Sequence, residues 1–162
     1  MFTLRHERPD DGPHINALLD ASFGPGRFAK TAYRLREGVE CIDALSWVAE
    51  EAGEIRATIR YWPIKVGGVP SLMLGPIAVL PAHRGRGIAV ALMNRTLEEA
   101  AALGHRAVIL VGDEPYYARV GFARVPAGTM TMPGPVDYAR LLGRDLAPGG
   151  LSELSGAITK GR

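Results

Sequence analysis

Two apolar segments joined by an amphipathic segment constrain the fold of this chain most. Residues 69–80 and 106–111 are almost wholly apolar, as is typical of strands that are covered on both faces. Between them, residues 87–103 repeat apolar side chains at helical spacing, and Gly104 follows where a helix end tolerates a left-handed residue. Since a strand, a helix and a second strand in this order form a right-handed crossover between parallel strands, the pattern predicts an α/β core.

The segments before and after this core predict shorter elements. In chain order we expect a strand over 2–7, a helix over 14–23 ended by Gly24-Pro25-Gly26, a second helix over about 27–37, and a hairpin of strands 46–49 and 55–61 joined by a polar turn over 50–54. After Gly112 we expect a short helical turn and a strand opened by Gly121, and the Gly- and Pro-rich residues 127–162 predict one or two late strands. The length of 162 residues suits a single domain, so any active site should lie within one core.

One dipeptide conflicts with a regular strand over 69–80. Gly75-Pro76 lies inside this segment, and proline cannot donate the backbone hydrogen bond that a central strand needs. The strand is therefore expected to be bulged, to lie at an edge, or to leave a gap beside its neighbour at this point.

Composition and charge argue against several classes of function. The formal net charge is only +2 and the basic residues are scattered, so no stripe suited to nucleic acid is expected. No apolar run approaches the ~20 residues of a membrane-spanning helix, and the N-terminus lacks the long apolar run of a signal peptide. The lone Cys41 cannot form an internal disulfide. We expect a cytoplasmic protein, monomeric or homodimeric, without nucleic-acid or membrane partners, and we predict no metal site.

The most informative candidate site is the loop that opens the helix over 87–103. Residues Arg84, Gly85, Arg86 and Gly87 combine glycines, which let a phosphate approach the backbone, with the exposed amides and dipole of a helix N-terminus. A plain Gly-rich turn with surface arginines is the simpler alternative. A nucleoside-triphosphate loop would need Lys-Ser or Lys-Thr after its last glycine, which is absent, and a dinucleotide-binding loop would need a glycine where Val90 stands.

The same residues resemble the acyl-CoA signature of the GNAT superfamily of N-acetyltransferases, Gln/Arg-x-x-Gly-x-Gly/Ala after an apolar strand. Arg84, Gly87 and Ala89 match that signature, residues 74–81 look like the family's fourth strand, and residues 117–122 look like its late Tyr-x-x-x-Gly-Phe segment. The resemblance spans residues 72–125. It implies a central mixed, mostly antiparallel sheet with one parallel, splayed strand pair and flanking helices.

The resemblance also implies where acetyl-CoA, the cosubstrate, would bind. The pantetheine arm would lie as a pseudo-strand between the two splayed strands, along the backbone of Ile77, Ala78 and Val79. The pyrophosphate would be held by the amides of the helix opening, namely those of Arg84, Gly85, Arg86, Gly87, Ile88 and Ala89. Tyr117 would be the general acid that protonates the departing CoA thiolate, because a phenol with a pKa of about 10 stays protonated at neutral pH. The acetyl group would pass by direct attack to a primary amine of a small molecule or a peptide.

The sequence departs from the family pattern just before the tyrosine. Many members carry Asn-x-x-Ala there, whereas residues 112–115 of this chain read Gly-Asp-Glu-Pro. Asp113 follows a predicted parallel strand, so it either caps the next helix or touches the incoming amine.

The general base stays unassigned. The acidic residues Glu50, Glu51 and Glu54 are expected in a solvated hairpin turn. His14 and His83 are further candidates, and water is another route for the amine proton.

Two other functions fit the same residues. The first is a CoA-binding sensor or scaffold module that keeps the cofactor site without catalysing transfer. The second is a small dinucleotide-binding oxidoreductase built on Gly85 and Gly87.

Overall fold

The computed structural model describes residues 1–24, 27 and 30–161, and that part of the chain contains nine strands. The strands are β1 (Thr3–His6), β2 (Trp47–Glu51), β3 (Glu54–Val66), β4 (Val69–Val79), β5 (Ala107–Val111), β6 (Ala123–Arg124), β7 (Met130–Thr131), β8 (Leu141–Asp145) and β9 (Gly156–Lys160). The α-helices are α1 (Gly12–Phe23), α2 (Thr31–Arg34), α3 (Ile88–Ala102) and α4 (Glu114–Tyr117). Single 3-10 turns stand at η1 (Pro9–Asp11), η3 (Asp43–Leu45), η4 (Pro81–His83), η5 (Ala118–Val120) and η6 (Tyr138–Arg140).

These strands form a mixed sheet in the order β1-β2-β3-β4-β5-β8-β6. Neighbours along this order are antiparallel except β4 and β5, which are parallel and are joined through α3. The predicted crossover and the mostly antiparallel sheet are therefore confirmed. Strand β9 pairs with the far end of β3 and, in parallel, with β7.

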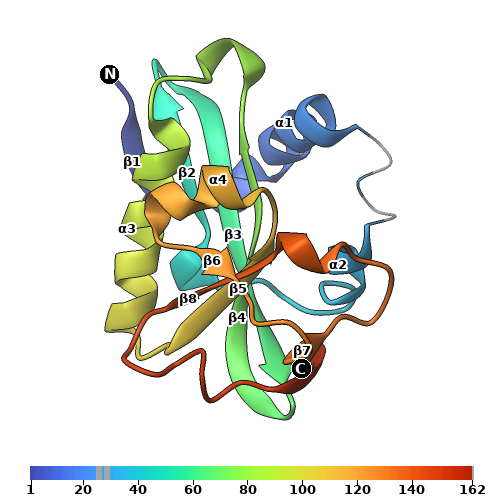
Figure 1. Ribbon diagram of the computed structural model, residues 1–162. Coiled ribbons are helices and arrows are strands. Elements are labelled where there is room, and N and C mark those ends of the chain that lie inside the picture. The colour runs from blue at the N-terminus through green and yellow to red at the C-terminus, as the bar shows by residue number, and fades with distance from the viewer. Residues whose placement is uncertain (25–26, 28–29, 162) are drawn as a thin grey trace.

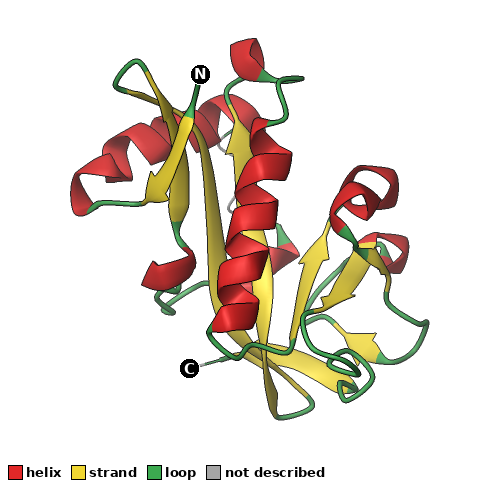
Figure 2. Ribbon diagram, turned by 90° about the vertical axis from the view of Figure 1, so that its left-hand side faces the viewer, coloured by secondary structure: helices red, strands yellow, loops and turns green. Residues whose placement is uncertain are grey.

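Helices cover both faces of the sheet. Helix α3 lies along the long central strands (Figure 2) and buries Leu92, Met93 and Leu97 against β2 to β5. Helix α1 lies on the opposite side (Figure 1), where its buried apolar residues pack on Val48 and Ala78. Each fully buried leucine side chain contributes about 1.5–3 kcal/mol, so the apolar stripe of α3 is what fixes this helix on the sheet. None of the described helices is long and apolar enough to cross a membrane.

The predicted second helix over 27–37 is wrong in extent. Of the described residues, only Thr31–Arg34 form an α-helical turn, and residues 28 and 29 lie outside the description, as do Pro25 and Gly26. The amides of Leu35 and Arg36 bond three residues back, which is the tighter 3-10 spacing, and Gly38 adopts a φ of 72°. The segment therefore turns back toward the sheet instead of extending as a helix.

The hairpin and the tail also differ from expectation. The tight turn between β2 and β3 consists of Ala52 and Gly53 alone, so Glu50 and Glu51 belong to a strand. The tail contributes three strands, β7, β8 and β9, where one or two were predicted. The three strands are short, and what makes them strands is pairing, of β8 with β5, of β9 with β3 and of β7 with β9, which no local pattern reveals.

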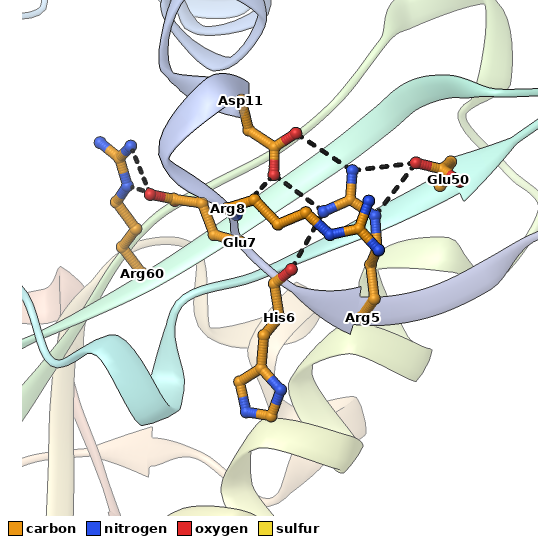
Figure 3. Close-up of polar contacts among 7 residues, drawn as sticks. All are labelled: Arg5, His6, Glu7, Arg8, Asp11, Glu50 and Arg60. Carbon is orange, nitrogen blue, oxygen red and sulfur yellow. Dashed lines mark hydrogen bonds and ion pairs between the residues drawn. The ribbon is translucent and has the colours of Figure 1, made fainter.

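A cluster of charged side chains ties β1 to the rest of the sheet (Figure 3). Arg5 donates to both oxygens of Asp11, at 2.8 and 3.0 Å, and to Glu50 at 2.9 Å. The Asp11 carboxylate also accepts from the backbone amide of Arg8 at 2.7 Å. Asp11 is the N-cap residue of α1, but its side chain does not cap that helix; it closes the preceding turn onto β1.

We expect Asp11→Asn to lower the free energy of unfolding by about 1–3 kcal/mol at pH 7, the range for hydrogen bonds to charged groups. Hydrogen bonding to Arg5 lowers the pKa of Asp11, so its contribution is present above the unfolded pKa of about 3.9 and is lost as pH falls through the folded-state pKa. Urea unfolding at pH 7 and pH 3 tests this, with the exposed Asp10→Asn as control. A deficit of the same size at both pH values would contradict it.

Candidate active site

The parallel pair β4 and β5 opens into a seam. The two strands are in register only at Leu72 with Val108 and Met73 with Ile109, although β4 continues to Val79. Along this stretch β4 remains paired with β3, and the register shifts opposite Gly75-Pro76, whose peptide bond is cis. The expected irregularity is therefore a bulge toward β3 together with a gap toward β5.

A cavity of about 620 Å³ lies at this seam. One wall comes from residues 73–77 of β4, and the opposite wall comes from residues 110–113 at the end of β5 and from Tyr116 and Tyr117 of α4. Residues 30–36 around α2 and residues 132–140 of the tail complete it. Its size falls within the roughly 300–1,000 Å³ typical of small-ligand sites.

The backbone of β4 alternates in the direction of its hydrogen-bonding groups. The amide of Leu80 donates to the carbonyl of Arg56 on β3 at 2.8 Å. Because successive residues of a strand point their backbone groups to opposite edges, Ala78 also faces β3, while Ile77 and Val79 face the seam. The backbone contact of Ile77 and Val79 with pantetheine stays a prediction, with which this direction is compatible. Ala78 does not face the seam, because its side chain packs under α1 and its backbone groups face β3.

The loop before α3 presents free backbone donors. Gly85 and Gly87 have φ values of 81° and 78°, which turn the chain so that Gly87 becomes the N-cap of the helix. The first amide with an intrahelical acceptor is that of Ala91, which donates to Gly87 at 3.0 Å. Among the described residues, the amides from Gly85 to Val90 have no acceptor, which is the arrangement an anion site requires. This loop does not line the seam cavity; β4 connects the two.

Both arginine side chains of the loop are engaged by the protein itself. Arg84 Nε donates to the carbonyl of Val79 at 3.3 Å. Arg86 forms a two-point pair with Glu51 at 2.9 and 2.6 Å, and its guanidinium lies 2.9 Å from Nδ1 of His83. The side chains therefore brace the loop, and its amides are the groups that face outward.

Glu51 is not the solvated turn residue that the sequence suggested. Its carboxylate bonds Arg86 and the N-terminal amine, and these two partners lower its pKa to about 2. Glu50 likewise pairs with Arg5 and Glu54 with Arg56. A carboxylate that stays ionised to such a low pKa is a poor general base.

Tyr117 lies at the end of α4 with its side chain on the wall of the seam cavity. Its ring packs edge-on against Tyr116 and Phe122 and covers Gly112, where any Cβ would overlap the ring. In the described structure its hydroxyl has no hydrogen-bond partner. Burial, followed by the nearby Tyr116 and Asp113, raises the pKa of Tyr117 to about 12, so the phenol is protonated at all physiological pH values.

The remaining sequence candidates occupy other places. Asp113 is the N-cap residue of α4 but makes no side-chain cap; its carboxylate lies 3.3 Å from Arg140 and lines the cavity. His14 lines a separate depression beside Glu50, and Cys41 accepts a hydrogen bond from Ser46 at 3.4 Å. Neither His14 nor Cys41 lines the seam cavity.

Sequence reasoning missed several basic residues of the cavity wall. Arg36 reaches the wall beside Gly75, and Arg140 comes from the tail. Only a tertiary contact brings these segments together, so no spacing in the sequence could have found them. The one local signal was the pair Arg34 and Arg36 in a segment for which a helix was predicted.

Comparison with known proteins agrees with this geometry. The family model for the acetyltransferase (GNAT) family matches residues 14–124. Among curated proteins, the N-acetyltransferase YhbS of Escherichia coli is 34% identical over 122 residues, covering 74% of this chain and 72% of YhbS.

Two solved structures extend the similarity to three dimensions. The crystal structure of E. coli YhbS in complex with CoA superposes with a TM-score of 0.84 at 28% identity, over 98% of this chain and 89% of that chain. A GNAT family acetyltransferase from Brucella melitensis in complex with acetyl-CoA gives a TM-score of 0.63 at 34% identity, over 76% of this chain and 83% of the other.

Proposed function

Because this chain belongs to the GNAT family of acetyltransferases, we propose that it transfers an acetyl group from acetyl-CoA to a primary amine by direct attack. The observation that carries the proposal is the seam itself, where the edge of β4 has left β5 and the Tyr117 hydroxyl, without a hydrogen-bond partner in the described structure, lies on the opposite wall. Helix amides without acceptors lie beyond the end of the same strand. The oxidoreductase alternative loses its support, since the family match covers the glycines on which it was based.

The residues present fit the two ends of acetyl-CoA. A pantetheine arm carries amide groups, and Ile77 and Val79 direct a backbone edge toward the place such an arm would occupy. A pyrophosphate needs several donors and positive potential, which the amides from Gly85 to Val90 and the dipole of α3 supply.

The chemistry asks three things of this chain. The cavity walls align the amine so that its nitrogen attacks the thioester carbonyl, forming the C–N bond as the C–S bond breaks. A seam-facing backbone amide, that of Ile77 or Val79, donates to the carbonyl oxygen as negative charge develops there. Tyr117 gives its phenolic proton to the departing sulfur and recovers one from solvent, while the proton of the amine leaves through water.

We expect an assay of free thiol release to show amine-dependent turnover of acetyl-CoA, at least tenfold above its hydrolysis without acceptor. The panel would include polyamines, amino acids, aminoglycosides and peptides with free N-termini, and mass spectrometry would identify the acetylated product. Tight acetyl-CoA binding by calorimetry without acceleration by any amine would instead favour the sensor or scaffold function.

A further inference from the structure

Three arginines, Arg27, Arg36 and Arg60, line one small cavity, and only two of them have a carboxylate partner in the described part of the chain. Arg27 pairs with Asp20 at 3.1 Å, and Arg60 pairs with Glu7 at 2.8 Å. Arg36, in the same group, forms no ion pair with any carboxylate in the described part of the chain. It borders both the seam cavity and a smaller cavity of about 480 Å³ behind it.

The Arg36 guanidinium is nevertheless fixed in place. Its central carbon lies 4.8 Å from the ring centroid of Tyr33 and 5.8 Å from that of Trp62. A Cβ at Gly75 would lie 2.6 Å from its Nη2 atom, so glycine at this position leaves the room that the guanidinium occupies. Its Nε atom is buried without a hydrogen-bond partner. The guanidinium is thus held beside the bulge of β4, with the Tyr33 side chain as a hydrogen-bonding neighbour and its Nε donor unused.

Keeping an unbalanced charge here is costly. Burial lowers the pKa of Arg36 to about 10; Tyr33 opposes this shift and the charges of Arg60 and Arg27 add to it, and the group is still charged at neutral pH. Buried charges in proteins are normally paired, because an unpaired one forfeits its hydration. Such a group in a cleft is a candidate for ligand binding.

The wall of the seam cavity has a surplus of positive charge. Its described lining includes five basic side chains, Arg27, Lys30, Arg34, Arg36 and Arg140, and two acidic ones, Asp113 and Asp137. Both acids are already engaged, Asp113 by Arg140 at 3.3 Å and Asp137 by the amide of Ala139 at 3.0 Å. An incoming anion would therefore meet attraction rather than a competing carboxylate.

We propose that Arg36 binds a carboxylate of the acceptor, so that the substrate is a primary amine carrying a carboxylate near its amino group. The inference rests on the proposed acetyl transfer. A planar guanidinium matches a carboxylate at two points, which fixes the orientation of the carboxylate as well as its position. Because Arg36 touches Gly75, where β4 leaves β5, a substrate anchored there has its amine within the cavity that also contains Tyr117.

The experiment compares matched acceptors on the full chain. Each α- or ω-amino acid is assayed beside its methyl ester and beside the amine of the same skeleton without the carboxyl group. For the wild type we expect KM for the carboxylate-bearing member to be about tenfold to hundredfold lower, the range for a charge-assisted pair. Equal KM values across the members of each set would overturn the inference.

Two variants test whether Arg36 causes the preference for carboxylate-bearing amines. Arg36→Met keeps length and removes the charge, so we expect the ratio of KM between the plain amine and the carboxylate-bearing member of each set to fall to about one. Arg36→Lys should show part of the wild-type preference for carboxylate, since lysine keeps the positive charge but lacks the two parallel donors of a guanidinium. The control is Arg95→Met, an arginine of α3 outside the cavity that also stacks on a ring, that of Trp47 at 4.8 Å. A preference that survives Arg36→Met would show that Arg36 only supports the fold.

A binding measurement separates this inference from the proposed function. Calorimetric titration of amino acids into the CoA-saturated protein reports carboxylate binding without turnover. If amino acids bind in an Arg36-dependent manner but no amine is acetylated, the anion site stands and acetyl transfer fails. If amines are acetylated with no effect of the carboxylate, acetyl transfer stands and the anion site fails.

Discussion

Replacing Tyr117 by phenylalanine is expected to lower kcat about 100-fold, the lower end of the effect of a positioned general acid. The ring packs against Gly112, Tyr116 and Phe122, and these contacts do not require the hydroxyl, so the fold and the cavity wall should be retained. Because the hydroxyl would act only on the departing sulfur, affinity for acetyl-CoA should change less than twofold. Steady-state kinetics together with calorimetric titration of acetyl-CoA tests both halves of this expectation.

The pH dependence sharpens the test of Tyr117. Burial raises the pKa of Tyr117 to about 12, so its proton is available at all physiological pH values. Loss of this proton should therefore not lower kcat below about pH 11. Desolvation also raises the pKa of a thiol inside the same cavity above its usual value of about 8.5. The difference in pKa between the phenol that gives the proton and the thiolate that takes it is therefore smaller. Tyr116→Phe removes the hydroxyl of the more exposed neighbouring ring and should cost at most a few-fold. Unchanged turnover in Tyr117→Phe would remove this residue from the mechanism.

The sequence predicted the parts of the fold in which local pattern and tertiary environment agree. The amphipathic stripe of α3 and the apolar runs of β4 and β5 are specified by periodicity, and the crossover rule then sets their parallel pairing. Strand β8 pairs along the whole of β5, but its own sequence, Leu141–Asp145, contains Gly143 and two charged residues. Such a segment becomes a strand because it pairs with β5, and a single sequence does not reveal which strand will be its partner.

In the candidate site, too, some parts could be predicted from local sequence and others could not. The backbone roles that we propose for Ile77, Val79 and the loop before α3 depend on chain direction and helix geometry, and motifs were enough to predict them. Ala78 could not be separated from its neighbours without knowing which strand lies on which side of β4. The place of Arg36 in the cavity could not be predicted for a different reason: its environment depends on Gly75 and Trp62, which are far from it in sequence.

The helix opening allows a matched pair of variants that separates charge from shape. Gly85 is exposed, has a φ of 81°, and a Cβ built there meets no atom within 4 Å. Asparagine and aspartate tolerate this left-handed conformation better than other residues, and they have nearly the same size. Any difference between Gly85→Asn and Gly85→Asp therefore reports the added negative charge beside the amides.

We expect Gly85→Asp to weaken CoA binding about tenfold relative to Gly85→Asn, because a carboxylate near the pyrophosphate repels it by about 1–3 kcal/mol before salt screening. The ratio should shrink when calorimetry is repeated at high salt, since the site is exposed. An acetylated pantetheine that lacks the pyrophosphate should bind both variants equally, because the contacts that we propose for it lie along Ile77 and Val79 in the seam. Equal CoA affinities for the two variants at low salt would mean that the diphosphate lies elsewhere, and the free amides of α3 would then need another explanation.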